Sequence, residues 1–441
     1  MSEPTLIVPH STRRFLLVAF IAIAMLVPLS LVRGVSDERQ SYYRSALTEV
    51  ATAWGGAQSL AGPFLVVPEE YAVSQEVGGG AAAQTTVVRE RVYLPKSVVL
   101  NLDVRHQFRE RAIYQVPVYT SNLRFSGTFA APQTGGAEEG LIRVLPHRAR
   151  LVVGIRETKA IMDAGALTFG DAVARFEGMP TEAWLGGGIQ ARVQLPEGVQ
   201  GVAFDFELTV KGSQHLAFLP VAAATRAEAS SSWPHPSFDG EYLPESYEIR
   251  DDGFDAQWQV HELARSLPDS FMADEQPTPV SVTADSASIR LFQPLTEYRL
   301  VDRATKYGLL FIALTFLGFV CFELTLALKF HPVQYGVVGV ALVLFYLALL
   351  SLSEHVPFGV AYLLATALLT TLVGWYVWAM TRSRRTTAWT VAIIGALYGT
   401  LYVLLRLEAF ALLTGTAVLF LGLAALMFST RRMSGEPVAA V

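Results

Sequence analysis

Ionisable side chains inside apolar segments are the first candidates for chemistry in this sequence, because burying a charge in hydrocarbon is costly. Glu323 lies near one end of such a segment, and Lys329 follows shortly after it. A carboxylate at that depth could serve as a proton site or bind a ligand. Pairing with Lys329, or with another cation at the same helix end, explains Glu323 without any chemistry, and we prefer that interpretation.

Glu354 and His355 end the next apolar segment, where an imidazole could titrate near neutral pH. Such a pair could act in proton transfer. A turn at the helix end, or a salt bridge from Glu354 to Arg406, requires no catalysis. We therefore expect a structural role for both residues.

A stripe of small and hydroxyl-bearing residues runs along the segment that precedes Glu354. On a 3.6-residue period, Tyr335, Gly339, Tyr346 and Ser353 share one side of a helix, and Leu and Val cover the rest. Tyrosine hydroxyls such as that of Tyr346 could bond to neighbouring helices or line a transport path. Packing is the simpler hypothesis, since no broken helix and no paired intramembrane acids accompany them.

The polar part of the chain contains one aromatic segment with a possible binding role, at residues 233–238. Trp233 and His235 alternate there with prolines, and Gly240 follows. The segment could dock a partner or face the membrane. Because proline restricts the backbone, a rigid connection between strands is the interpretation that we prefer.

No pattern in the sequence indicates a metal, a cofactor or a known catalytic motif. His261–Glu262 lacks the second histidine of the zinc motif HExxH, and no GxSxG, phosphate-binding or dinucleotide-binding motif is present. The histidines of the polar part are scattered without metal-ligand spacing: His106, His147, His215, His235 and His261. We therefore expect no catalytic, cofactor-binding or metal-binding residues.

Six apolar runs must position these side chains. The run at 333–352 has no charge over about 20 residues, which is enough to cross the hydrocarbon core as a helix. The others lie at about 15–32, 307–328, 356–380, 388–405 and 409–429. The first run is long for a signal peptide and lacks a small-x-small cleavage site, so we predict an uncleaved anchor.

The distribution of Lys and Arg predicts the orientation. With Arg13 and Arg14 inside, the clusters at 382–385 and 431–432 also fall inside, and the large polar part falls outside. The predicted order is a cytoplasmic N-terminus at 1–14, an anchor helix at 15–34, an extracytoplasmic domain at 35–303, a five-helix bundle at 304–430 and a cytoplasmic tail at 431–441.

The extracytoplasmic part shows the period of two that is typical of half-buried strands, most clearly at 100–104, 189–195, 202–210 and 256–260. A separate amphipathic helix is predicted at about 37–54, with Ser36 as N-cap and Gly55 as stop. Residues 158–164 could form another helix, and 78–83 and 133–139 resemble flexible loops. The predicted fold class is an α-helical membrane protein with six transmembrane helices and a large, mainly antiparallel, β-rich extracytoplasmic domain between helices one and two.

Composition agrees with this division. The net charge of −5 averages an acidic polar part and a final third with few charges, and no basic block indicates a nucleic-acid partner. The single cysteine, Cys321, excludes an intramolecular disulfide. The partners that we expect are the lipid bilayer and a periplasmic or envelope component.

Five segments in the same order give the chain a resemblance to a known family. They are Glu38-Arg39-Gln40 with Trp54-Gly55 and Gly62-Pro63, residues 233–238, residues 302–311, residues 331–335 and residues 351–355. Together they resemble the inner membrane protein CreD family. The resemblance implies a bacterial inner-membrane protein that is linked to envelope integrity and to the response of the Cre two-component system, with no established catalytic activity. It supplies no active-site residues.

Three functions follow as hypotheses. The first is a non-enzymatic protein of cell-envelope integrity and envelope stress, in which the β-rich domain contacts an envelope component and the bundle anchors it. The second is a transporter or channel for an envelope metabolite or lipid, which would need a polar cavity reaching Glu323. The third, a hydrolase in the extracytoplasmic domain, would need a nucleophile and base in one cleft.

Overall fold

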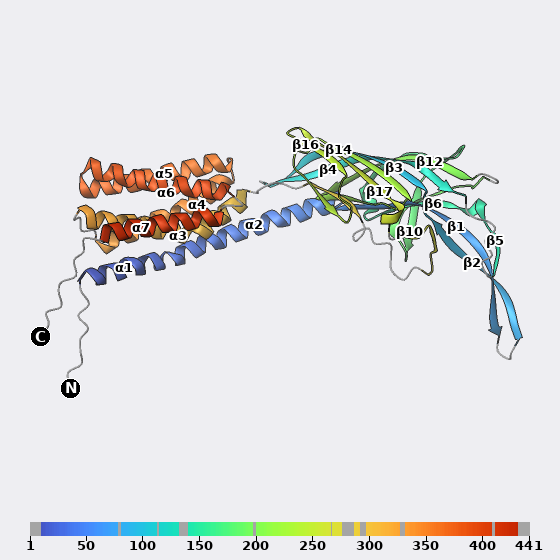
Figure 1. Ribbon diagram of the computed structural model, residues 1–441, viewed down its shortest axis with the longest axis horizontal. Helices are drawn as coiled ribbons and strands as arrows, with labels where there is room; N and C mark the ends of the chain where they lie inside the picture. The colour runs from blue at the N-terminus through green and yellow to red at the C-terminus, as the bar shows by residue number, and fades with distance from the viewer. Residues whose placement is uncertain are drawn as a thin grey trace. The chain divides into compact units, whose positions relative to one another are not determined.

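The computed structural model of the chain describes residues 10–77, 81–112, 114–131, 140–196, 200–265, 267–275, 286–291, 297–326, 331–407 and 411–430. These residues form two compact units. A helical unit comprises Met1–Arg44 and Leu295–Val441, and a β-rich unit comprises Ser45–Pro294. Figure 1 gives the order of the elements along the chain.

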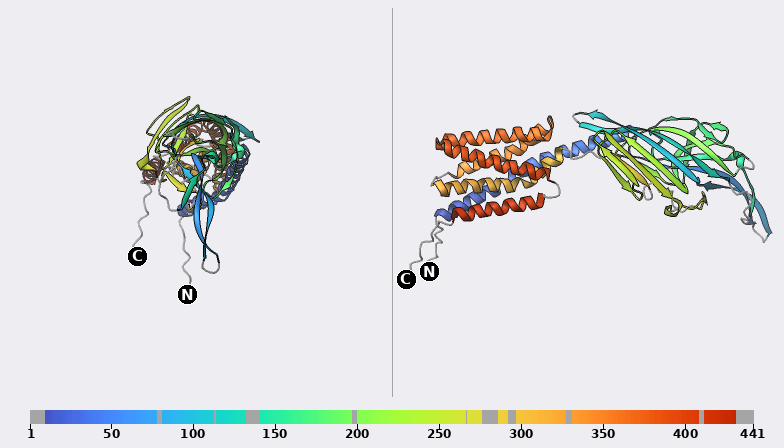
Figure 2. Two further views of the ribbon diagram at one scale, coloured as in Figure 1. Left: turned by 90° about the vertical axis from the view of Figure 1, so that its right-hand side faces the viewer. Right: turned by 45° about the horizontal axis from the view of Figure 1, so that its top comes forward.

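Seven α-helices are described: α1 His10–Ala24, α2 Leu26–Trp54, α3 Glu297–Leu326, α4 Pro332–Ser353, α5 Phe358–Thr381, α6 Arg384–Arg406 and α7 Ala411–Thr430. Figures 1 and 2 show α3 to α7 lying alongside one another. Within the described residues, five helical stretches are long and apolar enough to cross a membrane: Leu16–Trp54, Arg299–Cys321, Pro332–Ser353, Phe358–Thr381 and Arg384–Arg406. A shorter apolar stretch, Leu413–Ala424, lies in α7. The six-span count therefore stays a prediction.

The ends of α4 and α6 show why these helices begin where they do. Pro332 occupies the first turn of α4, where its missing N–H costs nothing. The His331 N–H donates to Gln334 Oε1 at 2.8 Å, and the Val333 N–H donates to His331 Nδ1, so a capping box forms. Ser383 caps α6 by accepting from the Thr386 N–H.

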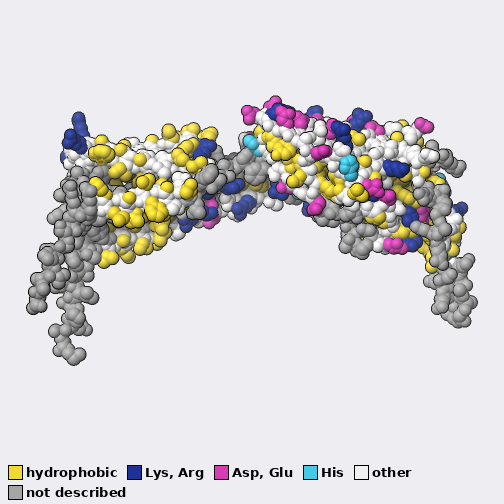
Figure 3. All heavy atoms as spheres, in the orientation of Figure 1, with side chains coloured by type: hydrophobic (Ala, Val, Ile, Leu, Met, Phe, Trp, Pro, Cys, Tyr) yellow, Lys and Arg dark blue, Asp and Glu magenta, His cyan; other side chains and the backbone are white. Residues whose placement is uncertain are grey.

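The stripe predicted along residues 335–353 lies on α4 and is buried. Tyr335, Gly339, Tyr346 and Ser353 are all buried in the helical unit. The leucines and valines of α4 divide between this interior, as Leu342 does, and the exposed surface, as Val333 does. Figure 3 shows hydrophobic side chains gathered over the surface of these helices. An apolar exterior around a packed interior is what lipid contact requires.

The predicted amphipathic helix at 37–54 is not a separate element. The chain turns once at Met25 between α1 and α2, and α2 then continues through Gly34 and Ser36 to Trp54. Ser36 is buried rather than acting as an N-cap. A single glycine costs a helix only about 1 kcal/mol, so Gly34 does not interrupt it. The predicted stop is confirmed, because Gly55 has φ +115°.

The predicted boundaries at 34 and 303 both fall within continuous helices, α2 and α3. The compact units divide instead after Arg44 and after Pro294. The predicted boundaries lie near the ends of apolar runs. Both helices continue beyond these runs through polar residues, so the end of an apolar run does not mark the end of the helix.

The β-rich unit contains two sheets (Figure 1). The ten-stranded sheet follows the order β10 (Glu177–Glu182), β11 (Gly186–Arg192), β6 (Arg150–Ile155), β1 (Gln58–Val77), β13 (His215–Leu219), β19 (Ala287–Leu291) and β15 (Pro236–Gly240), with β2 (Ala81–Tyr93) and β5 (Leu141–Val144) paired to β1 and β18 (Ser270–Met272) paired to β2. The nine-stranded sheet follows β16 (Ser246–Arg250), β17 (Gly253–His261), β14 (Ala224–Ser231), β3 (Ser97–Arg111), β4 (Tyr114–Ala130), β12 (Gly201–Ser213), β8 (Leu167–Phe169) and β9 (Ala172–Ala174), with β7 (Ile161–Ala164) paired to β12. Two pairings are parallel, β1 with β13 and β14 with β3, and the other described pairings are antiparallel.

The alternating strands bury one face each, as their period predicts. In β17 every second side chain from Phe254 to Val260 is buried, and β3 and β12 show the same alternation. Trp258 in the nine-stranded sheet contacts Phe218 and Phe238 of the ten-stranded sheet, with ring centroids 5.6 and 5.7 Å apart. The two sheets therefore share one hydrophobic core.

Two local predictions differ from the structure. Residues 158–164 form a single 3₁₀ turn, Thr158–Ala160, followed by strand β7. Residues 81–83 belong to β2 rather than to a loop, and residues 78–80 and 133–139 lie outside the described residues. Strand β7 is held by long-range pairing to β12, which a short window of sequence does not reveal, whereas residues 81–83 pair with residues 75–77 of β1 in a hairpin.

Candidate functional site

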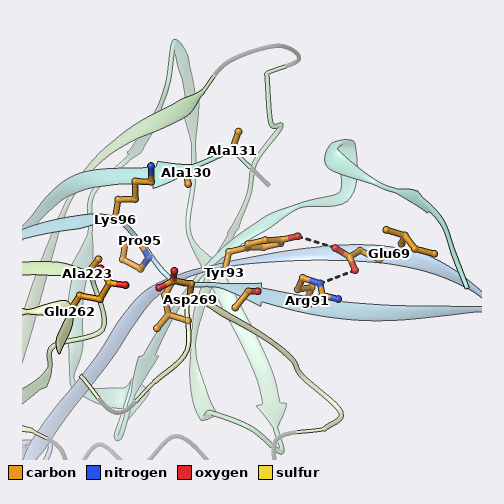
Figure 4. A pocket seen from close by; sticks show the side chains of 13 residues that line it. Glu69, Arg91, Tyr93, Pro95, Lys96, Ala130, Ala131, Ala223, Glu262 and Asp269 are labelled. Carbon is orange, nitrogen blue, oxygen red and sulfur yellow. Dashed lines mark hydrogen bonds and ion pairs between the residues drawn. The ribbon is translucent and has the colours of Figure 1, made fainter. Parts of the chain in front are cut away.

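A pocket of about 630 Å³ lies in the β-rich unit and is the candidate site (Figure 4). This volume falls within the range of about 300–1,000 Å³ of small-molecule sites. Strands β1, β2 and β18, the turn from β2 to β3, the end of β4 and the 3₁₀ turn Glu262–Ala264 supply its walls. The described lining residues are Glu69, Arg91, Tyr93, Leu94, Pro95, Lys96, Ala130, Ala131, Leu141, Ala223, Glu262, Asp269 and Ser270.

One wall is built around the buried carboxylate of Glu69, which is 2% exposed. Arg91 Nε donates to Glu69 Oε2 at 3.0 Å, and the Tyr71 hydroxyl donates to the same oxygen at 2.7 Å. The Tyr93 hydroxyl donates to Oε1 at 3.0 Å, and Arg91 also donates to the Tyr71 hydroxyl. Figure 4 shows Arg91 and Tyr93 directed at the two carboxylate oxygens.

The pairing of β1 with β2 explains how these side chains meet. The two strands are antiparallel, with Glu69 opposite Arg89, Val67 opposite Arg91 and Leu65 opposite Tyr93. Side chains two positions apart on a strand share one face, so Arg91 is the diagonal neighbour of Glu69, and Tyr93 lies one step further along the same face. Since Glu69 is buried and accepts three hydrogen bonds, these side chains form a rigid wall.

Burial, and then the negative Glu69 carboxylate, raise the pKa of the Tyr93 hydroxyl. Tyr93 therefore keeps its proton in the folded state at a pH where the unfolded chain ionises. A raised folded-state pKa gives stability that is present below the ordinary value of about 10 and is lost as the pH rises through the folded value.

We expect the alkaline side of stability to depend on Tyr93. Hydrogen exchange of β1 and β2 should show an opening free energy that falls above about pH 10, by up to about 1.4 kcal/mol per pH unit for each such group. Tyr93→Phe should flatten this slope while costing about 1 kcal/mol at neutral pH. The exposed Tyr247→Phe is the control, and an unchanged alkaline slope in Tyr93→Phe would refute the assignment.

The charges at the mouth of the pocket are arranged differently from those in its wall. Lys96 and Glu262 are exposed, and neither forms an ion pair with any residue that the structure describes. Asp269 pairs with Arg265, whose side chain is 5% exposed and also donates to the Val221 carbonyl. In Figure 4 the Pro95 ring lies between Lys96 on one side and the Glu262 side chain on the other.

The described residues show neither a metal site nor a catalytic pair at this pocket. No group of three or more His, Cys, Asp or Glu that could hold a metal ion occurs among them. No histidine is among the described residues that line the pocket, so Ser270 has no imidazole beside it there. What the lining offers is recognition by charge, hydrogen bonds and small apolar surfaces.

Glu323, the first candidate from the sequence, lies in the helical unit and accepts a hydrogen bond from the Tyr335 hydroxyl at 3.0 Å. Lys329, its predicted partner, lies outside the described residues. A cavity beside Tyr335 measures only about 10 Å³, about one water-sized probe. This contact favours a packing role over a transport path.

The predicted salt bridge from Glu354 to Arg406 is wrong, because Glu354 pairs with Arg39 of α2, with 3.5 Å between Nε and Oε1. Arg406 instead donates to the Tyr402 hydroxyl within its own helix. His355 Nδ1 lies 3.2 Å from the Ser351 carbonyl oxygen, at the helix end. The predicted structural role of Glu354 and His355 agrees with these contacts, and only the partner differs.

Tyr346 and Trp233 are buried, whereas the side chain of His235 is exposed. Tyr346 is fully buried and meets Phe345 edge-on at 5.0 Å. Trp233 is 4% exposed, and its indole N–H donates to the His235 carbonyl at 2.9 Å. These contacts agree with the predicted rigid connection from β14 to β15, and the buried Trp233 ring leaves little surface for docking.

The structure does not bring the sequence candidates together, and the pocket residues were missed. Glu323, Tyr346, Glu354 and His355 lie in the helical unit, whereas Trp233 and His235 lie in the β-rich unit away from the pocket lining. One signal was present in the sequence. Arg89, Arg91 and Tyr93 alternate along one segment, and the acidic residue Glu69 lies in the segment before it, with a glycine run between the two. This order is typical of two neighbouring strands whose side chains carry opposite charges.

The family match and a relative found among known proteins point to the same family. Residues 10–435 match the CreD family, described as inner membrane protein CreD. The inner membrane protein CreD of Escherichia coli (strain K12) is 32% identical over 419 residues, which cover 93% of this chain and 90% of that protein. Among solved structures, the crystal structure of an M1 zinc metallopeptidase from Deinococcus radiodurans has a TM-score of 0.21 and 10% identity, covering 79% of this chain and 96% of that one. That likeness carries no argument about fold or chemistry. Because the family match spans nearly the whole chain and the relative is similar over nine-tenths of its length, this chain belongs to the CreD family of inner membrane proteins.

Proposed function

We propose that this multi-pass inner membrane protein maintains the cell envelope without catalysing a reaction. Its β-rich unit lies on the periplasmic side and binds an envelope component through the pocket at Glu69, Lys96 and Glu262. Six transmembrane helices, with both termini in the cytoplasm, anchor the β-rich unit. The observation that carries this proposal is a pocket of about 630 Å³ with a rigid charged wall, lined also by Lys96 and Glu262, which form no ion pair with any described residue.

The character of the pocket supports binding rather than catalysis. The Glu69 carboxylate already accepts three hydrogen bonds, from Tyr71, Arg91 and Tyr93, so it is committed to the wall. Lys96 and Glu262 are exposed and lack a described ion-pair partner, so they are free to meet a ligand. Charged groups at a binding site fix orientation and specificity.

The distribution of charge along the chain supports the orientation. Arginines cluster where α5 gives way to α6, with Arg382 in the connection and Arg384 and Arg385 in the first turn of α6, and this end of the helices would be cytoplasmic. An odd number of helices separates it from the β-rich unit, if the three helices α3, α4 and α5 all cross the membrane. The β-rich unit then lies on the opposite side.

A complementation experiment tests the function. A strain that lacks the protein should become more sensitive to detergent and chelator stress, and the wild-type chain should restore resistance. The Lys96→Glu and Glu262→Lys variants should accumulate normally in the membrane and fail to restore it. The control is charge reversal of the exposed pair Glu157 and Lys159, which lies outside the pocket lining. Unchanged sensitivity of the deletion strain, or full rescue by both pocket variants, would contradict the proposal.

A further inference from the structure

The pocket carries an inference about the class of ligand, which rests on the proposed function. We propose that it binds a short peptide with a free amino end and a free carboxyl end. The ammonium group pairs with Glu262, the carboxylate pairs with Lys96, and small aliphatic side chains lie against the wall between them. The following observations lead to this class.

The first observation is the presence of opposite charges that do not satisfy one another. Lys96 and Glu262 line the same pocket, and no ion pair joins them. A ligand with one net charge would meet an attractive group at one position and a repulsive group at the other. A dipolar ligand satisfies both, and partial enclosure makes each charge-assisted hydrogen bond stronger than it would be in open water.

The second observation is that the remaining charges are already neutralised. Arg91 bonds to Glu69, and Arg265 bonds to Asp269. The net charge that the pocket presents to a ligand is therefore that of Lys96 and Glu262 together. Two opposite unit charges cancel, which disfavours polyanions and polycations alike.

The third observation is the small size of most apolar side chains in the described pocket lining. Leu94, Pro95, Ala130, Ala131 and Ala223 supply short side chains, and more than half of the described lining residues are polar. Small side chains leave room for a peptide backbone and its methyl-sized substituents, whereas long acyl chains would need a continuous apolar groove.

A zwitterionic phospholipid headgroup also carries one positive and one negative charge, but it lacks the small aliphatic groups of a peptide. Its phosphate and ammonium groups lie on one short linker, which leaves Ala130, Ala131 and Ala223 without a contact. A peptide of a few residues brings hydrogen-bonding amides and methyl groups, which match Ser270 and the alanines. The observations therefore favour the peptide.

Calorimetric titration of the full-length protein in detergent micelles tests the proposal. The probes are Ala-Ala-Ala, its N-acetylated form, its C-terminal amide, and glycerophosphoethanolamine as the headgroup. We expect Ala-Ala-Ala to bind, and blocking either end to weaken binding at least tenfold. Glycerophosphoethanolamine should bind at least tenfold more weakly than the free peptide.

Variants assign each end of the peptide to its residue. The Lys96→Gln variant should bind Ala-Ala-Ala and its C-terminal amide with equal affinity, while N-acetylation still weakens binding tenfold. The Glu262→Gln variant should bind Ala-Ala-Ala and its N-acetylated form with equal affinity, while the C-terminal amide still binds tenfold more weakly. Lys159→Gln and Glu157→Gln, which replace an exposed pair outside the pocket lining, should behave as wild type. These residues match the pocket pair in charge and side-chain length.

Three results would overturn the proposal: equal binding of free and blocked peptides, tighter binding of glycerophosphoethanolamine, or end-dependence that Lys96→Gln and Glu262→Gln leave unchanged. Such results would leave the envelope function standing if the charge-reversed pocket variants still failed to complement. Conversely, full complementation by those variants would remove the functional role of the pocket even if peptides bound. The two failures are thus distinguishable.

Discussion

Replacing Glu69 by alanine should destabilise the β-rich unit by about 3–5 kcal/mol, because the change leaves the Arg91 guanidinium buried without its carboxylate. The side chains of Arg91 and Glu69 are 13% and 2% exposed, so water in the pocket replaces the lost partner only in part. Two phenol hydroxyls, of Tyr71 and Tyr93, lose their acceptor in the same variant. Hydrogen exchange of β1 and β2 in the full-length protein measures the loss as a lower opening free energy.

Two controls separate the buried pair from an ordinary surface pair. Glu70 is the next residue and pairs with Arg143 on the exposed face, so Glu70→Ala should cost a small fraction of the Glu69→Ala effect. The double variant Glu69→Ala with Arg91→Met should recover part of the loss, since it removes the orphaned charge. Equal effects of Glu69→Ala and Glu70→Ala would refute the role of Glu69 as the centre of the pocket wall.

Trp258→Ala should have a comparable effect, about 3–5 kcal/mol, because it opens a cavity between the two sheets. Trp258 is 1% exposed, and its ring meets Phe218 and Phe238 on the facing sheet. Its indole N–H donates to the Tyr242 carbonyl at 3.2 Å. Hydrogen exchange should therefore rise in strands of both sheets, which distinguishes loss of the shared core from local fraying.

Trp258→Phe is the matched variant for this prediction. It keeps an aromatic ring between the sheets and loses the hydrogen bond to Tyr242, so we expect less than half of the alanine effect. Ile249→Ala, at a position 48% exposed on the neighbouring strand β16, is the surface control. If Trp258→Ala raised exchange in the nine-stranded sheet alone, the two sheets would not share one core.

The regular elements could be predicted because their signals are local. Alternation at 202–210 and 256–260 reports burial of one face of a strand, and uncharged runs such as 333–352 report a helix that can face lipid. Gly55 ended α2 as predicted, since a glycine at positive φ is a local requirement. In each case the deciding interaction lies within a few residues of the chain.

The pocket and the partner of Glu354 could not be predicted because they depend on contacts between distant positions. Glu354 pairs with Arg39, near the other end of the chain, rather than with the nearer Arg406. Lys96 and Glu262 line the same pocket because β2 turns into β3 and β18 pairs with β2. A short window of sequence determines neither the register of strands nor the packing of helices.

The continuous helix α2 shows a different limit. The sequence predicted a break at Ser36, because Ser, Asp and Glu suit the first turn of a helix, but these residues also tolerate a helix interior. Burial of Ser36 against the helical unit decided the outcome. Tertiary packing thus overrode the local capping signal.

The side of the membrane on which the β-rich unit lies tests the central claim most directly. In a Cys321→Ser background, Leu263→Cys places one fully exposed thiol beside the pocket, and Arg384→Cys places one at the start of α6. A membrane-impermeant maleimide applied to intact spheroplasts should label the Leu263→Cys variant and should label the Arg384→Cys variant only after the membrane is permeabilised. Labelling of the Arg384→Cys variant in intact spheroplasts, with the Leu263→Cys variant protected until permeabilisation, would place the pocket in the cytoplasm and contradict the account.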